Sequence, residues 1–238
     1  MELLSNKNVL VVGATGGIGA EVTRLLKNSQ ANVFIAARNR SKLNELATAN
    51  NIPADQVFAV DVTQPEQVEA AAYQIHARIP ALDILINASG IGIIRPLENL
   101  TYEDFNQVID TNLRGTFHLL KSFLPPMKEA KKGLVLNIPG VLGKTPMAGA
   151  GAYAASKYGI DGLVKSVREE LKRTNVRITN LYLGGTDTPF WDHIDMKVSR
   201  DKFVVAREAA RAVWFLCQQP NSGVVSEMVI QPFNHQAI

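Results

Sequence analysis

A glycine-rich turn between an apolar strand and a helix constrains the fold of this chain more than any other feature. The strand is Asn8–Val12, a β-branched run typical of a strand buried on both faces. The turn spans Gly13–Gly19, and a segment with apolar residues at helical spacing follows it. Glycine lets a ligand approach the backbone, and the start of a helix favours a bound phosphate. A simple turn between packed elements would look similar, but this placement favours a nucleotide site.

Beyond this turn, strand and helix patterns alternate along the chain. A second strand at Asn32–Ala37 completes a strand–helix–strand unit, and a segment of helical length separates each later strand from the next. This order predicts a single domain over residues 1–238 with a doubly wound, Rossmann-like α/β fold, in which helices cover both faces of a mostly parallel seven-stranded sheet. We expect the other strands at 56–60, 83–86, 134–138, 176–183 and 227–231, and the later helices at 41–50, 64–78, 101–120, 153–172 and 207–218.

The end of the second strand indicates which dinucleotide such a fold would bind. In these folds an acidic residue about 20 positions past the first glycine binds the ribose 2′-hydroxyl of NAD, whereas an arginine accommodates the 2′-phosphate of NADP. Here Ala37 is followed by Arg38, Asn39 and Arg40, without a carboxylate. The sequence therefore favours NADP(H), with NAD(H) as the alternative, although an arginine after a strand is often only a solvated surface charge.

Charge, cysteine and histidine content argue against several other classes of function. Lys and Arg exceed Asp and Glu by 3, and the charges are spread along the chain, so we expect no nucleic-acid partner. No stretch reaches the roughly 18 unbroken apolar residues of a membrane span. The single cysteine, Cys217, lies in an apolar run, which fits a reducing compartment and predicts a cytoplasmic protein. The 4 histidines lack metal-ligand spacing, so we expect no metal site.

One segment, residues 189–205, has no clear periodicity and is rich in aromatic and apolar side chains. It contains Phe190, Trp191 and Phe203 and follows the sixth predicted strand. Such a segment is either a packed loop or a mobile lid over a substrate, and its position after that strand favours a substrate lid.

Tyr153 and Lys157 form a candidate acid for catalysis. They lie four residues apart at the start of a predicted helix and so share one face of it. A free tyrosine has a pKa of about 10, and a nearby ammonium group would lower the pKa of Tyr153 by favouring the phenolate. The same spacing arises by chance in many helices, so the pair gains weight only from the nucleotide site predicted around it.

Three further polar residues stand at informative positions. Asp61 closes the third strand and Asn87 follows the fourth, at the edge where parallel sheets bind ligands, although each also suits a turn or a helix cap. Asn112 lies inside a predicted helix, where asparagine is unfavourable. Its side chain is either solvated, or it holds a water or bends the helix locally through hydrogen bonds to the backbone.

Taken in order, these motifs resemble those of the short-chain dehydrogenase/reductase family over essentially the whole chain. Residues 12–19, VGATGGIG, are similar to the family's TGxxxGIG turn, Asp61-Val62 to its DV pair, residues 87–90, NASG, to its NNAG motif, and Tyr153 and Lys157 to YxxxK. Thr188 matches the threonine that contacts the nicotinamide carboxamide. The cofactor-binding residues that the resemblance implies are Gly13, Thr15, Gly17, Ile18, Gly19, Arg38, Asp61, Val62, Asn87, Tyr153, Lys157 and Thr188.

The resemblance also implies a chemistry, which is hydride transfer between NAD(P) and an alcohol or ketone. Tyr153 would exchange a proton with the substrate oxygen, Lys157 would lower the pKa of Tyr153 and bind the nicotinamide ribose, and Asn112 would anchor a water. A homodimer or homotetramer is implied as well, with the helices that carry Asn112 and Tyr153 at the interface.

The chain departs from the family pattern at the residue that should hydrogen-bond the substrate oxygen. The family usually has a serine 13 residues before the tyrosine, and this chain has Gly140 there, directly after Pro139. Loss of one donor to a developing oxyanion costs on the order of 10²–10³ in rate. The nearby hydroxyl groups of Ser89 and Thr145 are the candidates to replace it.

These observations lead to two main hypotheses. The first is an NADP(H)-dependent oxidoreductase that interconverts a ketone or aldehyde and an alcohol, with a catalytic site altered by Gly140. The alternative is a catalytically weak or inactive NADP-binding sensor or partner subunit. A sugar-nucleotide-binding protein fits less well, because the chain is short for an added sugar-binding domain.

Overall fold

A computed structural model describes residues 4–194, 196–220 and 222–235, and its central element is a seven-stranded parallel sheet. The strands stand in the order β3-β2-β1-β4-β5-β6-β9, and every neighbouring pair runs parallel. The doubly wound α/β class and the seven strands are therefore confirmed. The strand bounds are β1 Asn8–Val12, β2 Asn32–Ala37, β3 Val57–Ala59, β4 Ile84–Asn87, β5 Gly133–Asn137, β6 Val176–Leu183 and β9 Glu227–Ile230.

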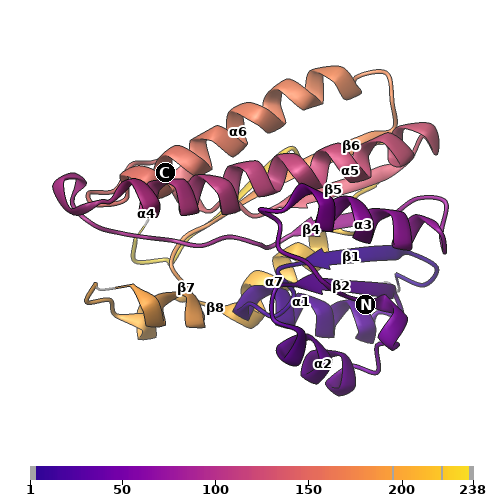
Figure 1. The fold of residues 1–238 in the computed structure, drawn as a ribbon, viewed down its shortest axis with the longest axis horizontal. Coiled ribbons are helices and arrows are strands. Elements are labelled where there is room, and N and C mark those ends of the chain that lie inside the picture. The colour runs from indigo at the N-terminus through magenta and orange to yellow at the C-terminus, as the bar shows by residue number, and fades with distance from the viewer. Residues whose placement is uncertain (1–3, 195, 221, 236–238) are drawn as a thin grey trace.

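Helices cover both faces of this sheet (Figure 1). On one face, α1 (Gly17–Asn28), α2 (Arg40–Ala49) and α7 (Ala206–Leu216) enclose one apolar core with the sheet. On the other face, α3 (Pro65–His76), α5 (Gly115–Glu129) and α6 (Gly151–Leu171) enclose a second core. Because both faces are buried, the strands are almost continuously apolar, as the sequence indicated.

The helix predicted over 101–120 is in fact three consecutive segments. They are α4 (Tyr102–Ile109), one π-helical turn (Asp110–Arg114) and α5, which continues to Glu129. The predicted end at residue 120 was wrong, since α5 runs on through Pro125 and Pro126. Proline removes a helical hydrogen bond, but the same turns bury Phe123, Leu124 and Met127 in the second core, and this burial compensates for the loss.

The sheet places its ligand-binding edge between β1 and β4. From β1 the chain proceeds to β2 and β3 on one side, and from β4 to β5 and β6 on the other. Such a reversal of strand order opens a crevice beyond the carboxyl ends of the strands. A small second sheet of β7 (Thr186–Asp187) and β8 (Val204–Val205), which we did not predict, lies at this same end of the molecule (Figure 1).

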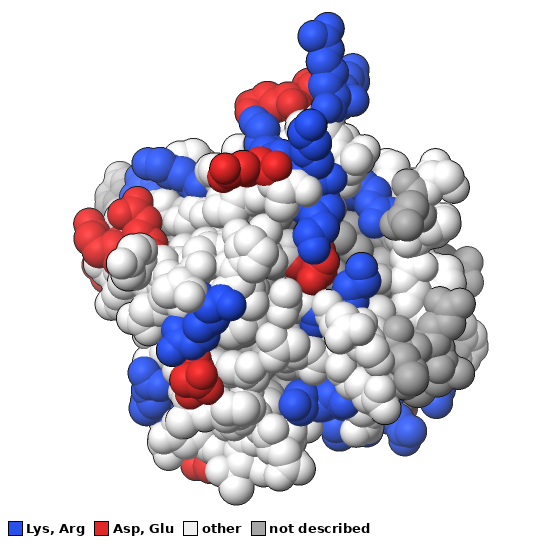
Figure 2. Space-filling model, turned by 90° about the vertical axis from the view of Figure 1, so that its right-hand side faces the viewer, with Lys and Arg blue, Asp and Glu red and all other residues white. Residues whose placement is uncertain are grey.

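Charged side chains give little indication of a large charged partner. On the described part of the face that Figure 2 shows, Lys and Arg are interspersed with Asp, Glu and broad neutral surface. None of the described helices is long and apolar enough to cross a bilayer. Among the described residues, no group of three or more His, Cys, Asp or Glu is arranged to hold a metal ion.

The glycine turn after β1 is packed so closely that only glycine fits at two of its positions. Gly13 has a φ of +77°, and a Cβ added there would lie 2.6 Å from the carbonyl oxygen of Ala88. A Cβ on Gly19 would lie 2.2 Å from the carbonyl oxygen of Gly13. Because of these close contacts, the start of α1 lies against the end of β1 and the segment after β4. Together these three segments form the floor of the crevice.

We expect Gly19→Ala to destabilise the fold, because its new methyl group has only rigid backbone atoms to displace. The loss should be about 3 kcal/mol, the upper part of the usual range for overpacking. Gly16→Ala is the matched control, because its Cβ would lie 3.3 Å from the same carbonyl oxygen and asks for a shift of only tenths of an ångström. Urea unfolding of both variants measures the difference, and equal stabilities would contradict the packing argument.

Candidate active site

A cavity of about 1180 Å³ runs along the crevice at the carboxyl ends of the strands. The glycine turn, the ends of β2 and β3, the segment after β4, the loop between β5 and α6 and the segment after β6 all contribute to its wall. Among the described residues that line it there is no Asp or Glu, whereas several lysines and one arginine do line it. The cavity is therefore suited to an anionic ligand of dinucleotide size.

Tyr153 and Lys157 lie side by side in this cavity wall, as the four-residue spacing predicted. Both come from the first two turns of α6, and the ammonium nitrogen of Lys157 is 5.1 Å from the centre of the Tyr153 ring. Lys157 is almost fully buried, while Tyr153 is partly exposed to the cavity. A Cβ on Gly90 would lie 3.2 Å from Lys157 Nζ, so the segment after β4 passes directly beside the lysine.

The expected effect of Lys157 on the pKa of Tyr153 was wrong. Burial raises the pKa of Tyr153 to about 12, and burial lowers the pKa of Lys157 to about 8. Among the described residues no hydrogen bond joins the two side chains, so desolvation of each group outweighs their mutual attraction. Tyr153 is therefore a neutral phenol at pH 7, ready to donate its proton, and Lys157 is still mostly charged.

Asn112 holds together the parts that surround this pair, without lining the cavity itself. Its side-chain oxygen accepts a hydrogen bond from the N–H of Ile91 (2.9 Å), and its amide nitrogen donates to the carbonyl of Ile91 (2.9 Å) and to Ser156 Oγ (2.9 Å). Thr116 Oγ1 donates to the Asn112 carbonyl (2.6 Å) in the π-helical turn. Of the alternatives that the sequence left open, solvation is excluded because Asn112 is only 1% exposed.

Most of the predicted cofactor-binding residues meet at the cavity. Asp61 and Asn87 do not line it. The Asp61 carboxylate accepts hydrogen bonds from the N–H and hydroxyl of Thr63 (both 2.9 Å), which is the turn role that the sequence left open. The Asn87 amide donates to Thr116 Oγ1 (3.0 Å), and its oxygen accepts from Ser89. The residues that do line the cavity are Gly13, Thr15, Gly17, Ile18, Gly19, Arg38, Val62, Tyr153, Lys157 and Thr188.

Two cavity residues beside Arg38 were missed by the sequence reasoning. Asn39 caps α2 by accepting a hydrogen bond from the N–H of Lys42 (2.9 Å), and both side chains line the cavity next to Arg38. Because α2 starts directly after the strand, Lys42 lies one helical turn beyond Arg38. This four-residue spacing could have predicted from the sequence that Lys42 lies near Arg38. Arg40, in contrast, donates to the carbonyl of Val57 (3.0 Å) and so has a structural role.

Gly140 borders Tyr153 at the position where the sequence resemblance implies a serine. A Cβ added there would lie 3.8 Å from the Tyr153 hydroxyl oxygen, so a side chain at this position would reach the reacting group. However, Gly140 has φ 78° and ψ 163°, a conformation essentially restricted to glycine. Ser89 Oγ donates to Asn87 (2.6 Å), whereas the Thr145 hydroxyl lines the cavity and has no hydrogen-bond partner among the described residues.

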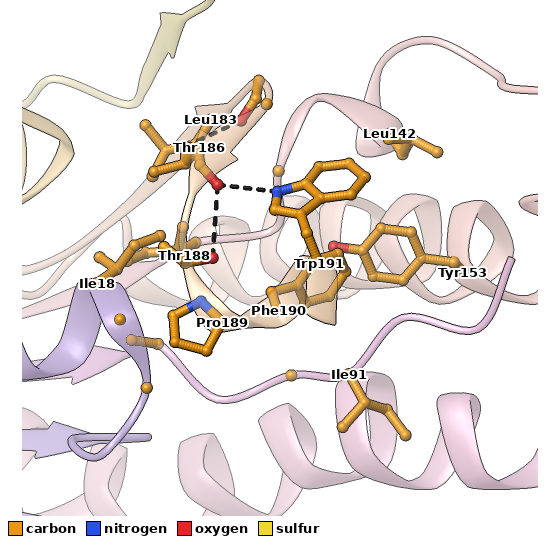
Figure 3. A pocket seen from close by; sticks show the side chains of 18 of the residues that line it. Ile18, Ile91, Leu142, Tyr153, Leu183, Thr186, Thr188, Pro189, Phe190 and Trp191 are labelled. Atoms are coloured by element: carbon orange, nitrogen blue, oxygen red, sulfur yellow. Dashed lines mark hydrogen bonds between the residues drawn. The ribbon is translucent and has the colours of Figure 1, made fainter. Parts of the chain in front are cut away.

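The segment 189–205 folds over the same cavity through several specific contacts, although residue 195 lies outside the described part. Arg200 forms ion pairs with Asp187 and Asp192 (both 2.6 Å). Trp191 donates from its indole nitrogen to the carbonyl of Thr186 (2.9 Å). Figure 3 shows Tyr153 with its hydroxyl turned towards Phe190 and Trp191. The segment is therefore packed against the cavity, and this packing fits both a fixed loop and a lid in its closed position.

The sequence from residue 7 to residue 198 matches the family model for short chain dehydrogenases. The chain belongs to the short-chain dehydrogenase family. A relative of this short-chain dehydrogenase is an uncharacterized oxidoreductase of Staphylococcus epidermidis, 30% identical over 232 residues that cover 98% of this chain and 100% of the relative. The protein is thus a member of an oxidoreductase family.

Solved structures of the same family are similar over nearly the whole of this short-chain dehydrogenase. One is an alcohol dehydrogenase from the archaeon Thermococcus sibiricus complexed with 5-hydroxy-NADP, with a TM-score of 0.86, 27% identity, and 98% and 99% of the two chains covered. Another is a metagenomic short-chain oxidoreductase in complex with NADP, with a TM-score of 0.82, 29% identity, and 96% and 98% covered.

We expect Lys157→Met to remove a pH-dependent part of the stability of this short-chain dehydrogenase. The pKa of Lys157 is about 8 in the folded protein and 10.5 without burial, so between these values the unfolded chain binds more protons and stability rises with pH. The rise is on the order of 3 kcal/mol. Urea unfolding across this pH range tests the expectation, with Lys121→Met, at an exposed lysine, as the control. If the difference in unfolding free energy between wild type and Lys157→Met stays constant with pH, the expectation is contradicted.

Proposed function

We propose that this protein interconverts a ketone or aldehyde and an alcohol with NADP(H). The observation that carries the proposal is the meeting of Tyr153 and Lys157 in one cavity with the glycine turn and Thr188. A proton donor and a dinucleotide-sized space then share one site. The NADP-bound alcohol dehydrogenase and short-chain oxidoreductase of similar structure support the same assignment.

The cavity residues fit NADP(H) better than NAD(H). Arg38 and Lys42 are exposed beside the end of β2, and none of the described residues that line the cavity there is a carboxylate that could bind a ribose 2′-hydroxyl. The cavity wall at the start of α1 includes Gly13, Gly16 and Gly17, and the first turn of this helix carries no acidic residue, so the region suits a pyrophosphate. When bound, NADP(H) would supply or accept the hydride.

Tyr153 would act as the proton donor in the reducing direction. Because its pKa is about 12, the phenol keeps its proton at neutral pH and donates it only as the substrate oxygen gains negative charge. The Lys157 ammonium group would stabilise the phenolate that forms. The side chain of Asn112 would hold the Ile91 backbone and the Ser156 turn of α6 at fixed positions around Tyr153 and Lys157. This protonation state is the one that a proton donor in the reducing direction requires.

Gly140 supports a second candidate function, a non-catalytic NADP-binding sensor or partner subunit. Without the serine, one donor to the substrate oxygen is absent, and the backbone at Gly140 has a conformation that disfavours its return. The Tyr153, Lys157 and Asn112 set gives the enzyme more weight, because a sensor has no need of a buried lysine beside a phenol.

We further propose that the protein works in the cytoplasm as a homodimer or homotetramer. Its one cysteine is buried, and burial raises the pKa of the Cys217 thiol to about 12, so it is unreactive, in keeping with a reducing compartment. The helices around the site leave large apolar side chains exposed, which suit contact with a second copy. These side chains are Tyr102, Phe105, Phe117 and Tyr158.

We expect NADPH-dependent reduction of at least one small ketone or aldehyde, faster than with NADH, and its loss in Tyr153→Phe. Absorbance at the nicotinamide band across a panel of carbonyl compounds measures the rate. Thermal stabilisation by NADPH should persist in the variant, because the phenyl ring keeps the packing. Stabilisation by NADPH with no turnover above the Tyr153→Phe background would instead favour the sensor.

We expect a Gly140→Ser variant to be faster than Gly140→Ala, by up to about 10²-fold in kcat, if a hydroxyl beside Tyr153 assists the substrate oxygen. Both side chains are strained at this φ, by about 1–3 kcal/mol, so their comparison isolates the hydroxyl. Comparing serine with wild type alone would mix the two effects. Equal rates for both variants would show that position 140 does not limit the reaction.

A further inference from the structure

Gly92, in the segment that follows β4, is in direct contact with the ring of Phe190. A Cβ added at Gly92 would lie 2.4 Å from Phe190 Cζ and 2.9 Å from Cε2, so the ring edge rests on the glycine backbone itself. The backbone conformation of Gly92 is open to any residue, since its φ is outside the left-handed region. The Phe190 ring, and not the backbone conformation, is therefore what a side chain added at this position would meet first.

Phe190 is held in this place from its other sides as well. Its ring centre lies 5.9 Å from that of Tyr153, and Trp191 packs edge-on against it at 5.4 Å and 82°. Trp191 is itself fixed by Phe203, at 4.9 Å, and by its hydrogen bond to the Thr186 carbonyl. The Phe190 ring thus spans the space between the segment after β4 and the candidate proton donor (Figure 3).

We propose that the Phe190–Gly92 contact sets the width of the substrate site beside Tyr153, and that this site takes a flat, apolar carbonyl compound. The proposal rests on the function proposed above. Apolar side chains line the same cavity, including Ile91, Leu142 and Met147, and such walls favour an uncharged substrate. With the ring seated on Gly92, a group branched next to the carbonyl carbon meets Phe190 before its oxygen reaches Tyr153.

The contact explains why the site depends on a residue without a side chain. An alanine at position 92 would push the ring away from the backbone, and because Phe190 lines the cavity, the displaced ring would change the shape of the cavity. Removal of the ring by Phe190→Ala leaves room for the methyl group, so the two substitutions together should be milder than Gly92→Ala alone.

Four variants test the proposal: Gly92→Ala, Phe190→Ala, the double variant, and Gly162→Ala as control. Gly162 lies in α6 and has nothing within 4 Å of an added Cβ, so its alanine variant reports a methyl group without a clash, together with the gain of about 1 kcal/mol for alanine over glycine inside a helix. Gly92→Ala should lower the melting temperature by about 5 °C in the wild-type background and by much less in the Phe190→Ala background. This comparison of melting temperatures does not depend on enzymatic activity. If Gly92→Ala lowers the melting temperature equally in both backgrounds, the proposed contact between Gly92 and Phe190 is wrong.

Substrate width is tested with acetophenone and its branched analogue 2,2-dimethylpropiophenone. Their kcat/KM ratio, and their binding by calorimetry in the presence of NADP, should shift towards the branched ketone by about 10-fold or more in Phe190→Ala. An unchanged ratio overturns the assignment of Phe190 as the wall, even if reductase activity is found. If the wild-type protein reduces neither ketone nor any other carbonyl compound, the proposed function is wrong. The ratio of the binding affinities for the two ketones would then still test whether Phe190 limits the width of the site.

Discussion

The side chain of Asn112 is the interaction on which the candidate site most depends. It binds the N–H and the carbonyl of Ile91 and also Ser156, and so ties the segment after β4 to α6 one residue before Lys157. Asn112 and Ser156 are buried and Ile91 is partly buried, so a buried polar group left unpaired here would carry a desolvation cost of about 1–3 kcal/mol. Asn112 lies in the π-helical turn, a kind of turn that is frequent at functional sites, and Thr116 Oγ1 donates to its carbonyl.

The same segment after β4 is bounded on its other sides by glycine contacts. Gly13 approaches Ala88, Gly90 leaves room for Lys157, and Gly92 receives Phe190. The wall that this segment gives to the cavity therefore combines glycine backbone with the side chains of Ile91 and Ile94, and Asn112 fixes it through its hydrogen bonds to Ile91. A site built this way keeps its shape with little freedom to adapt, which suits a reaction that needs a hydride donor and a proton donor at fixed positions.

The fold could be predicted from sequence because every level of pattern agreed on it: apolar strands, a glycine turn and alternating helices. The site was only partly predictable. Spacing placed Tyr153 and Lys157 on one face, but it could not reveal that burial dominates their pKa values, since burial depends on the packing of distant segments. Gly92 carried no signal in an irregular stretch, and the role of Phe190 became visible only once the chain had folded back onto it.

Gly140 shows why a missing motif residue is more than a missing functional group. Its φ of 78° turns the chain beside Tyr153 in a way that a serine disfavours, so the backbone and the residue type agree with each other. Under the proposed function, a second donor to the substrate oxygen would come from elsewhere in the cavity wall, and Thr145, on the same loop, lines the cavity with a hydroxyl that has no hydrogen-bond partner among the described residues. A weak donor there would, under the proposed function, leave the neutral phenol of Tyr153 with a larger share of the charge stabilisation, and the rate would then depend more strongly on how Phe190 positions the substrate beside it.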